Sequence, residues 1–177
     1  VWVSLLVAMV SGAVFSLLHA FASVSLNANQ VISGTAINMI AGAVTVFLAR
    51  TFTGSGNIQL TQGMPRFNVP LLSDIPVIGP LFFLQTYGTT WLILLLLALG
   101  TFVLYKTAFG LRLRACGEHP HAADAAGISV HKVRYVAVMI SGALAGLGGA
   151  TILVTYSGEF NGSVAGMGFL ALAALIF

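Results

Sequence analysis

One short polar segment, residues 116–132, carries most of the side chains in this chain that could do chemistry. Its sequence, CGEHPHAADAAGISVHK, holds three of the four histidines, the single cysteine and two of the four acidic residues. Cys116, His119 and His121 form a C-x2-H-x-H pattern, and thiolate and imidazole are common zinc ligands. A structural zinc site normally takes four ligands in two spaced pairs, and no fourth ligand stands at a recognised spacing here. We therefore expect no metal and no cofactor.

The same segment has the features of a short helix. Pro120 suits the first turn of a helix, where its missing N–H leaves no bond unmade. The next residues are mostly alanine, and Gly127 can supply the left-handed conformation that commonly closes a helix. The sequence predicts about two helical turns over residues 120–126. So short a helix is not stable alone in water. This favours a docking element for a partner, with a solvated loop as the alternative.

The composition places the rest of the chain in a membrane. Hydrophobic residues make up 58% of the chain and charged residues only 6%, whereas about 25% of the residues in a soluble domain are charged. The net charge is +3, and no basic patch interleaved with aromatic residues supports nucleic-acid binding. We expect an all-α, polytopic transmembrane helix bundle.

Five apolar stretches are candidate spans. They are residues 1–26, 31–50, 87–106, 133–155 and 164–177, of which the last is a truncated span. A helix of about 20 residues crosses the hydrocarbon core of a bilayer, roughly 30 Å thick. The stretches are continuous rather than alternating, which disfavours a membrane β-barrel.

The basic residues predict the orientation of the spans. Five of the seven Lys and Arg residues lie between the third and fourth stretches: Lys106, Arg112, Arg114, Lys132 and Arg134. Because cytoplasmic loops hold the excess of Lys and Arg, this connection is predicted to be cytoplasmic. Residues 51–86 and 157–163 then lie outside. The outer loop 51–86 holds four of the five prolines and should be irregular, with its VPLL and IPVIGPLFF pieces along the membrane surface.

The two ends of the sequence give an expectation about its extent. The chain starts VWVSLLVAMV, without Met or a basic leader, and ends inside an apolar run, FLALAALIF. We interpret residues 1–177 as a single transmembrane domain and as an internal fragment of a longer membrane protein.

Residues 110–150, GLRLRACGEHPHAADAAGISVHKVRYVAVMISGALAGLGGA, resemble the cytoplasmic loop and following helix of a family of ABC-importer permeases. This family serves simple sugars, nucleosides and branched-chain amino acids. The shared pattern, G-x-x-P-x-A-A-x-x-x-G-I, is present as Gly117, Pro120, Ala122, Ala123, Gly127 and Ile128. The segments NANQVISGTAINMIAGAVTVFLAR and GMGFLALAALIF extend the resemblance and look most like the nucleoside or simple-sugar branch.

The resemblance implies a role for the polar segment. In such permeases the short cytoplasmic helix is a coupling helix that sits in a groove of a cytoplasmic ATP-binding subunit. Carried over to this chain, the docking positions are Glu118, Pro120, Asp124 and Gly127. The resemblance also implies a second permease subunit, identical or different, an extracytoplasmic solute-binding protein, and the plasma membrane of a bacterium or archaeon.

The source of energy is predicted to be another subunit. The chain has no G-x-x-x-x-G-K-[ST] loop and therefore no P-loop ATP site. No pairing of His or carboxylate residues suggests an enzyme, and we expect no catalytic residues. Alternating access would be driven by a separate ATPase subunit, with an ion gradient as the alternative.

Uncharged polar residues concentrate near the start of the second stretch. Polar groups inside a span are costly and usually face the bundle interior or a cavity. The candidates for lining a translocation pathway are Asn29, Gln30, Ser33, Thr35 and Asn38. Their amide and hydroxyl groups suit a neutral, hydrogen-bonding solute such as a nucleoside or sugar. Alternatively, these groups hold neighbouring helices together.

A second pattern concerns packing. Gly142, Gly146 and Ala150 recur at four-residue intervals, a spacing of small residues that lets membrane helices approach closely. The contact would lie within one bundle or against a second permease subunit.

Other functions stay open at this point. The resemblance also allows a branched-chain amino acid permease. An ion-coupled secondary transporter would need a carboxylate or histidine near mid-membrane. Only His19 comes near that description, and we expect it to be packed or interfacial. A purely structural membrane protein would not need the polar run at 27–38.

Overall fold

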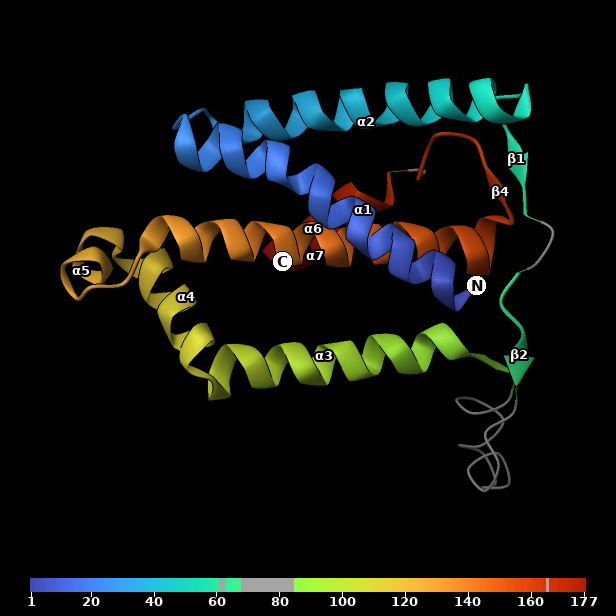
Figure 1. Cartoon of the computed structure of the whole chain (residues 1–177). Helices are drawn as coiled ribbons and strands as arrows, with labels where there is room; N and C mark the ends of the chain where they lie inside the picture. The colour runs from blue at the N-terminus through green and yellow to red at the C-terminus, as the bar shows by residue number, and fades with distance from the viewer. Residues whose placement is uncertain (61–62, 68–84, 165) are drawn as a thin grey trace, which may run out of the picture. The chain divides into compact units, whose positions relative to one another are not determined.

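The computed structural model describes residues 1–60, 63–67, 85–164 and 166–177. This part of the chain is mainly helical (Figure 1), and the predicted all-α, polytopic membrane fold is confirmed. The chain forms two compact units, one of Val1–Gln62 with Arg134–Phe177 and one of Gly63–Val133. The prediction for the VPLL and IPVIGPLFF pieces falls outside the described residues.

Four helices in the described part of the chain are long and apolar enough to cross a membrane. They are α1 (Trp2–Ala20) extended by the π-helical turn η1 (Phe21–Ser25), α2 (Gln30–Thr53), α3 (Gly88–Lys106), and α6 (Val130–Ile152) extended by the π-helical turn η3 (Leu153–Ser157). They match the first four predicted stretches. The fifth stretch forms α7 (Met167–Ile176), which has 10 residues, about half of what a crossing requires.

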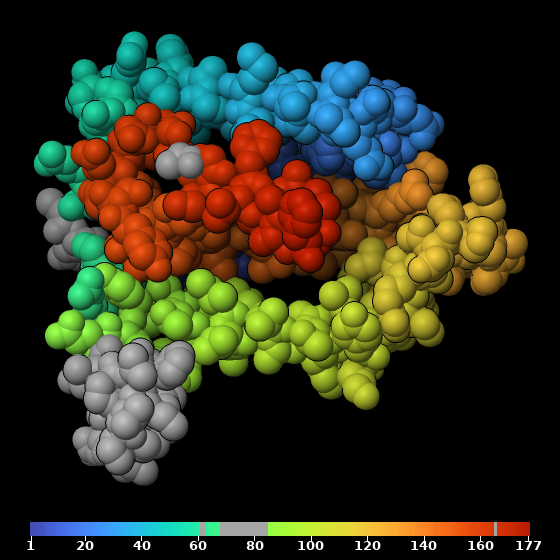
Figure 2. Space-filling model, turned by 180° about the vertical axis from the view of Figure 1, so that it is seen from behind, coloured from blue at the N-terminus to red at the C-terminus, as the bar shows by residue number. Residues whose placement is uncertain are grey.

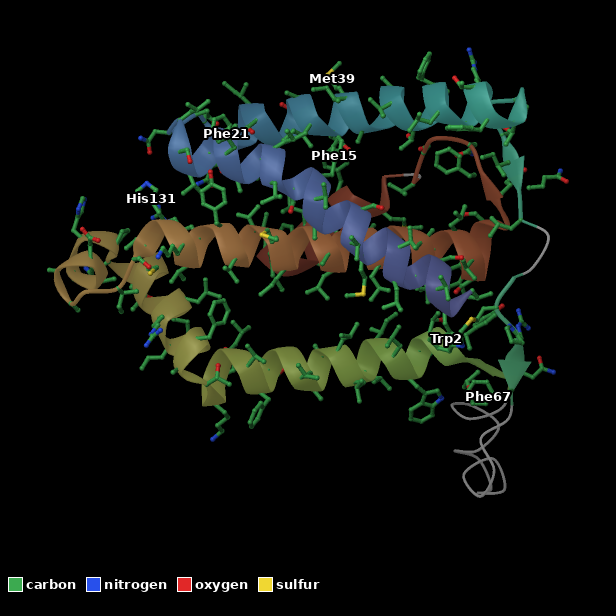
Figure 3. The ribbon with its side chains drawn as sticks, viewed as in Figure 1. Trp2, Phe15, Phe21, Met39, Phe67 and His131 are labelled. Atoms are coloured by element: carbon green, nitrogen blue, oxygen red, sulfur yellow. The ribbon has the colours of Figure 1, made fainter. Side chains whose placement is uncertain are left out.

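Most of the apolar surface of these helices is exposed. In the most apolar window of α2 no residue is buried, and in the other three spans 6–11% of the window is buried. Trp2, Phe21 and Met39 are 54%, 56% and 78% exposed, and Met39 lies on the outer side of α2 (Figure 3). Exposed apolar patches of this extent mark contact with lipid or with other protein.

In the first unit, α1 and α6 cross (Figure 1), and their backbones approach closely at glycines. A Cβ atom added to Gly142 would lie 2.6 Å from the carbonyl oxygen of Gly12 and would overlap Ser16. A Cβ atom added to Gly146 would overlap the carbonyl oxygen of Ala8. The two backbones are therefore in contact, which only small residues permit. Figure 2 shows the C-terminal segment in front of α6.

A two-residue ladder ties the ends of α2 and α6 together. Strand β1 (Ile58–Gln59) pairs antiparallel with β4 (Glu159–Phe160), and the N–H of Leu60 donates to the carbonyl of Gly158 at 2.8 Å. Both strands belong to segments that the alternation of spans places outside. Their pairing at one end of the unit agrees with that alternation.

In the second unit, an arginine–tyrosine pair lies at each end of α3. Strands β2 (Arg66–Phe67) and β3 (Thr86–Tyr87) pair, and the guanidinium of Arg66 lies 4.9 Å from the ring centre of Tyr87. The guanidinium of Arg114 lies 5.1 Å from the ring centre of Tyr105. The two tyrosines are separated by a helical rise of about 27 Å, close to the hydrocarbon thickness of a bilayer. Aromatic and basic side chains at both interfaces anchor a span.

A tight corner joins α3 to α4 (Ala108–Glu118), a helix that the sequence reading did not predict. The Thr107 hydroxyl donates to the carbonyl of Val103 at 2.6 Å and accepts from the N–H of Gly110 at 3.2 Å. Thr107 thus ends α3 and caps α4. A Cβ atom on Gly110 would overlap the carbonyl oxygens of Val103 and Leu104, so the corner requires glycine there.

The contact between α1 and α6 predicts a sharp response to one added methyl group. Gly142→Ala should force the helices apart. Overpacking of this kind lowers the free energy of unfolding by about 1–3 kcal/mol. The measurement is the melting temperature of the purified full-length protein in detergent. Gly148→Ala is the matched control on α6, because a Cβ atom there meets nothing within 4 Å. Equal melting temperatures for the two variants would contradict the close approach.

Candidate functional site

The short helix α5 (Pro120–Ala125) forms where the sequence predicts it, and Gly127 closes it. Gly127 has φ of +81°, in the left-handed region. Its N–H donates to the carbonyl of Asp124 at 2.9 Å, and the N–H of Ile128 donates to that of Ala123 at 3.0 Å. These two bonds form the Schellman motif, which satisfies the last carbonyls of a helix. The predicted helix and its glycine closure are confirmed.

A small apolar core holds α5 in place. It consists of Cys116 from α4, Ala123 from α5, and Val130 and Val133 from the first turn of α6. Leu113, Ala115 and Ile128 pack against it. A helix of 6 residues has too few internal hydrogen bonds to persist alone. This core therefore supplies the stability that α5 lacks.

The predicted docking positions lie around this core. Glu118 is the last residue of α4 and is exposed, as is Asp124 on α5. Pro120 is half-buried at the first position of α5, and Gly127 is exposed. The structure thus brings the four positions together on one short segment, with two carboxylates accessible to a partner.

The residues of the C-x2-H-x-H pattern do not share one environment. Cys116 is 2% exposed within the apolar core, whereas His119 and His121 are exposed. A buried free cysteine behaves as a small hydrophobic residue. Across the described ranges, no group of three or more His, Cys, Asp or Glu side chains is placed to hold a metal ion.

Two of the five pathway candidates are engaged inside the first unit. Asn29 caps α2, and its Oδ1 accepts from the N–H groups of Val31 at 2.9 Å and Ile32 at 3.4 Å. The Ser33 hydroxyl is buried and lies 3.0 Å from Nδ1 of His19, within hydrogen-bonding distance. Asn29 therefore starts the helix, and Ser33 joins α2 to α1. His19 is packed, as predicted.

The other three candidates lie on the surface of α2. The Thr35 hydroxyl donates to backbone carbonyls of its own helix, and Gln30 and Asn38 are exposed. Gly34 and Gly42 share a helix face with Asn38, since residues four apart are neighbours on a helix. A Cβ atom at either glycine would meet nothing within 4 Å. This face is open to a solute or to another helix.

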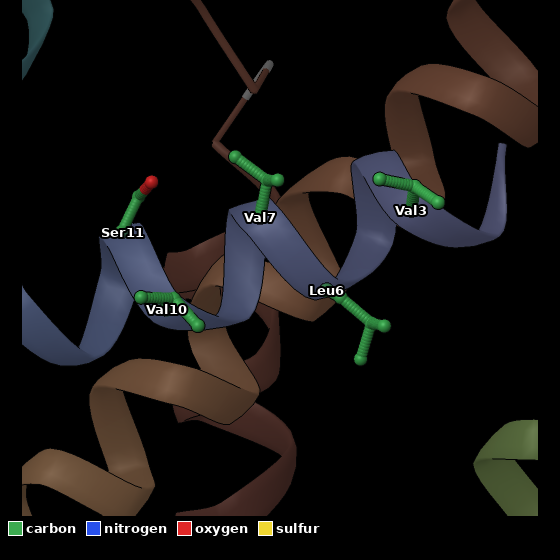
Figure 4. A pocket seen from close by; sticks show the side chains of 5 residues that line it. All are labelled: Val3, Leu6, Val7, Val10 and Ser11. Carbon is green, nitrogen blue, oxygen red and sulfur yellow. The ribbon is translucent and has the colours of Figure 1, made fainter.

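The packing candidates lie on α6. Gly142 and Gly146 contact α1 as described above, and Ala150 is half-buried. A hollow along α1 (Figure 4) is lined by Val3, Leu6, Val7, Val10 and Ser11. Its lining is almost wholly aliphatic and comes from a single helix. Such a surface suits lipid or an apolar helix better than a hydrogen-bonding solute.

Sequence reasoning missed a contact between Ser25 and Tyr135. Their hydroxyl groups lie 2.5 Å apart and are hydrogen-bonded, although 110 positions separate them in the chain. Ser25 ends η1, and Tyr135 lies in the second turn of α6. No local pattern marks either residue, because the bond exists only once α1 and α6 are packed.

The whole chain, residues 1–177, matches the family described as branched-chain amino acid transport system, permease component. It is 48% identical over 177 residues to the nucleoside ABC transporter permease protein NupC of Lactococcus lactis, covering 99% of this chain and 56% of that protein. It is 47% identical over 178 residues to the guanosine ABC transporter permease protein NupQ of Bacillus subtilis, with the same coverage.

A third relative is a permease of Haloferax volcanii whose name assigns it provisionally to glucose transport. It is 36% identical over 182 residues, covering 99% of this chain and 54% of that protein. The chain thus spans little more than half the length of these three relatives. No solved structure matches it.

The left-handed conformation at Gly127 predicts that Gly127→Ala loosens the end of α5. A left-handed conformation costs an alanine roughly 1–2 kcal/mol more than a glycine. We expect faster cleavage of the full-length protein between residues 119 and 129 in limited proteolysis. Gly117→Ala, in α4 with nothing within 4 Å of its added Cβ, is the control and should be cleaved as slowly as the wild type. Identical cleavage rates for both variants would refute a structural role for Gly127.

Proposed function

The chain belongs to the permease family of branched-chain amino acid transport systems, and on that premise we propose that it forms part of the membrane-spanning subunit of an ABC importer for nucleosides. Its four apolar helices indicate a multi-pass integral membrane protein, and its permease family and relatives place it in the plasma membrane. The observation that carries the proposal is the identity of 47–48% to two nucleoside permeases over 99% of this chain.

The polar groups on α2 support a nucleoside as the solute. Asn38 stands on an open face of a span, beside Gly34 and Gly42. An amide offers both donors and acceptors, which match the base edge and ribose hydroxyls of a nucleoside. A neutral lining of this kind would hold a charged amino acid less well, because it supplies no opposite charge. The simple-sugar branch is the second candidate, since a sugar presents similar hydroxyl groups.

In this proposal α5 is the coupling helix that docks on a separate ATP-hydrolysing subunit. A rigid helix end transmits displacement, whereas a flexible loop would absorb it. The Schellman closure at Gly127 and the apolar core of Cys116, Ala123, Val130 and Val133 give α5 that rigidity. Two permease subunits and an extracytoplasmic solute-binding protein complete the assembly that we propose.

An ion-coupled secondary transporter is the rival function. That mechanism requires a group within a span that binds and releases an ion or proton. None of the four acidic residues falls within the four spans, and the imidazole of His19 is engaged with Ser33. The four spans thus hold two histidines and no carboxylate. His131 lies in the first turn of α6, at the end of its span, and His19 is already bonded, which favours the ATP-driven importer.

A transport assay tests the pathway on α2. Asn38→Ala should raise the KM for nucleoside uptake at least about tenfold, the effect of losing roughly 1.4 kcal/mol of binding, without lowering the melting temperature. The measurement is uptake of labelled guanosine, a pentose and leucine by vesicles containing the complete importer. Ile40→Ala, on the opposite side of α2, is the control and should leave the KM unchanged. An unchanged KM for Asn38→Ala would place this face against a helix instead.

Charge reversal tests the docking surface. Glu118→Lys combined with Asp124→Lys should abolish co-purification of the ATPase subunit and ATP-dependent uptake, because both carboxylates are exposed at the proposed contact. Glu159→Lys, in the outer strand β4, is the control and should retain the subunit. Co-purification at the wild-type level with both inner carboxylates reversed would exclude this docking site.

A further inference from the structure

The hydrogen bond between Ser25 and Tyr135 joins two parts of the chain with different roles in the proposed importer. Tyr135 belongs to α6, which begins directly after the coupling helix. Ser25 belongs to η1, at the turn between α1 and α2. This bond is therefore placed to link motion of α5 to the helices that carry the pathway candidates.

The connection from α5 to Tyr135 is short and well packed. Only Ile128 and Ser129 separate Gly127 from the first residue of α6. Val130 and Val133 of the first turn of α6 are packed with Ala123 of α5 in one buried core. From Val130 the helix continues without interruption through Tyr135 to Ile152. The first turn of α6 is therefore packed directly against α5, in the same helix that contains Tyr135.

The segment that contains Ser25, between α1 and α2, is held by its own hydrogen bonds. The Ser23 hydroxyl donates to the carbonyl of His19 at 2.7 Å, and the ring of His19 is hydrogen-bonded to Ser33 at the start of α2. Ala20 and Val24 on the same segment are buried. These contacts connect Ser25 to the first turn of α2, where the predicted pathway residues begin.

We propose that Tyr135 is a positioning residue that couples ATP hydrolysis to opening of the pathway, through its hydrogen bond to Ser25. This inference rests on the proposed importer function. The bond lies at the surface, because Ser25 is exposed and Tyr135 is only half-buried, so the bond is not needed to fill the protein interior. Its loss should weaken the transmission of motion and leave the fold and the docking of α5 in place.

The test uses the complete importer in vesicles and measures both solute uptake and ATP hydrolysis. Tyr135→Phe, which removes only the hydroxyl oxygen, should lower the amount of solute carried per ATP at least about fivefold, the lower end of typical coupling effects. The rate of ATP hydrolysis, the melting temperature and co-purification of the ATPase subunit should stay at wild-type levels. Ser25→Ala should give the same ratio, and the double variant should be no worse than either single variant.

Tyr156→Phe is the matched control. Tyr156 lies in η3 at the other end of the same helical run and is 80% exposed, so its variant should keep the wild-type ratio. An unchanged ratio for Tyr135→Phe, an equal loss for Tyr156→Phe, or additive losses in the double variant would overturn the inference. Failure of the importer function itself has a different signature, since the wild-type assembly would then show no ATP-dependent uptake.

Discussion

The close approach of α1 and α6 is the contact on which the first unit depends. Lipid tails are as apolar as leucine, so burial of apolar side chains does not drive helices together in a bilayer. Van der Waals contact at short range must do so, and Gly12, Gly142 and Gly146 provide it by leaving backbone against backbone. Because these glycines lie far apart in sequence, their contact decides which distant segments meet. It brings Tyr135 of α6 within hydrogen-bonding distance of Ser25 at one end of the unit.

The exposed apolar surface of the spans is also explained by a lipid environment. The most apolar window of α2 contains no buried residue, a pattern that a water-soluble protein could not tolerate. A helix that contacts lipid or further helices is expected to have an apolar surface of this kind. The face with Gly34, Asn38 and Gly42 is open both to a solute and to another helix. This is why exposure alone does not separate pathway residues from packing residues on α2.

Features set by local chemistry were predictable from the sequence, and features set by distant contacts were not. Hydropathy located the four long helices, and Pro120 with Gly127 located α5, because each signal acts over a few neighbouring residues. Helix α4 was missed, although Phe109, Leu113 and Cys116 have the spacing of one apolar helix face. Arg112 and Arg114 lie between these positions and hid the pattern. Asn29 was predicted to line a pathway, although its position before α2 also suits a cap. The bond between Ser25 and Tyr135 needed the tertiary structure, so the candidate site was only partly predictable.

The centre of the α1–α6 pair is held by close backbone contact, whereas its ends consist of π-helical turns. At the centre, glycines hold two backbones together, and neither helix can shift there without losing contact. Each helix ends in a π-helical turn, η1 after α1 and η3 after α6. Their backbone bonds span five residues instead of four, as in the bond from the N–H of Leu26 to the carbonyl of Phe21. Such turns are less stable than α-helix and occur often at functional sites. In the importer that we propose, a fixed crossing between two such turns would let the ends of the α1–α6 pair rearrange about a constant centre during alternating access.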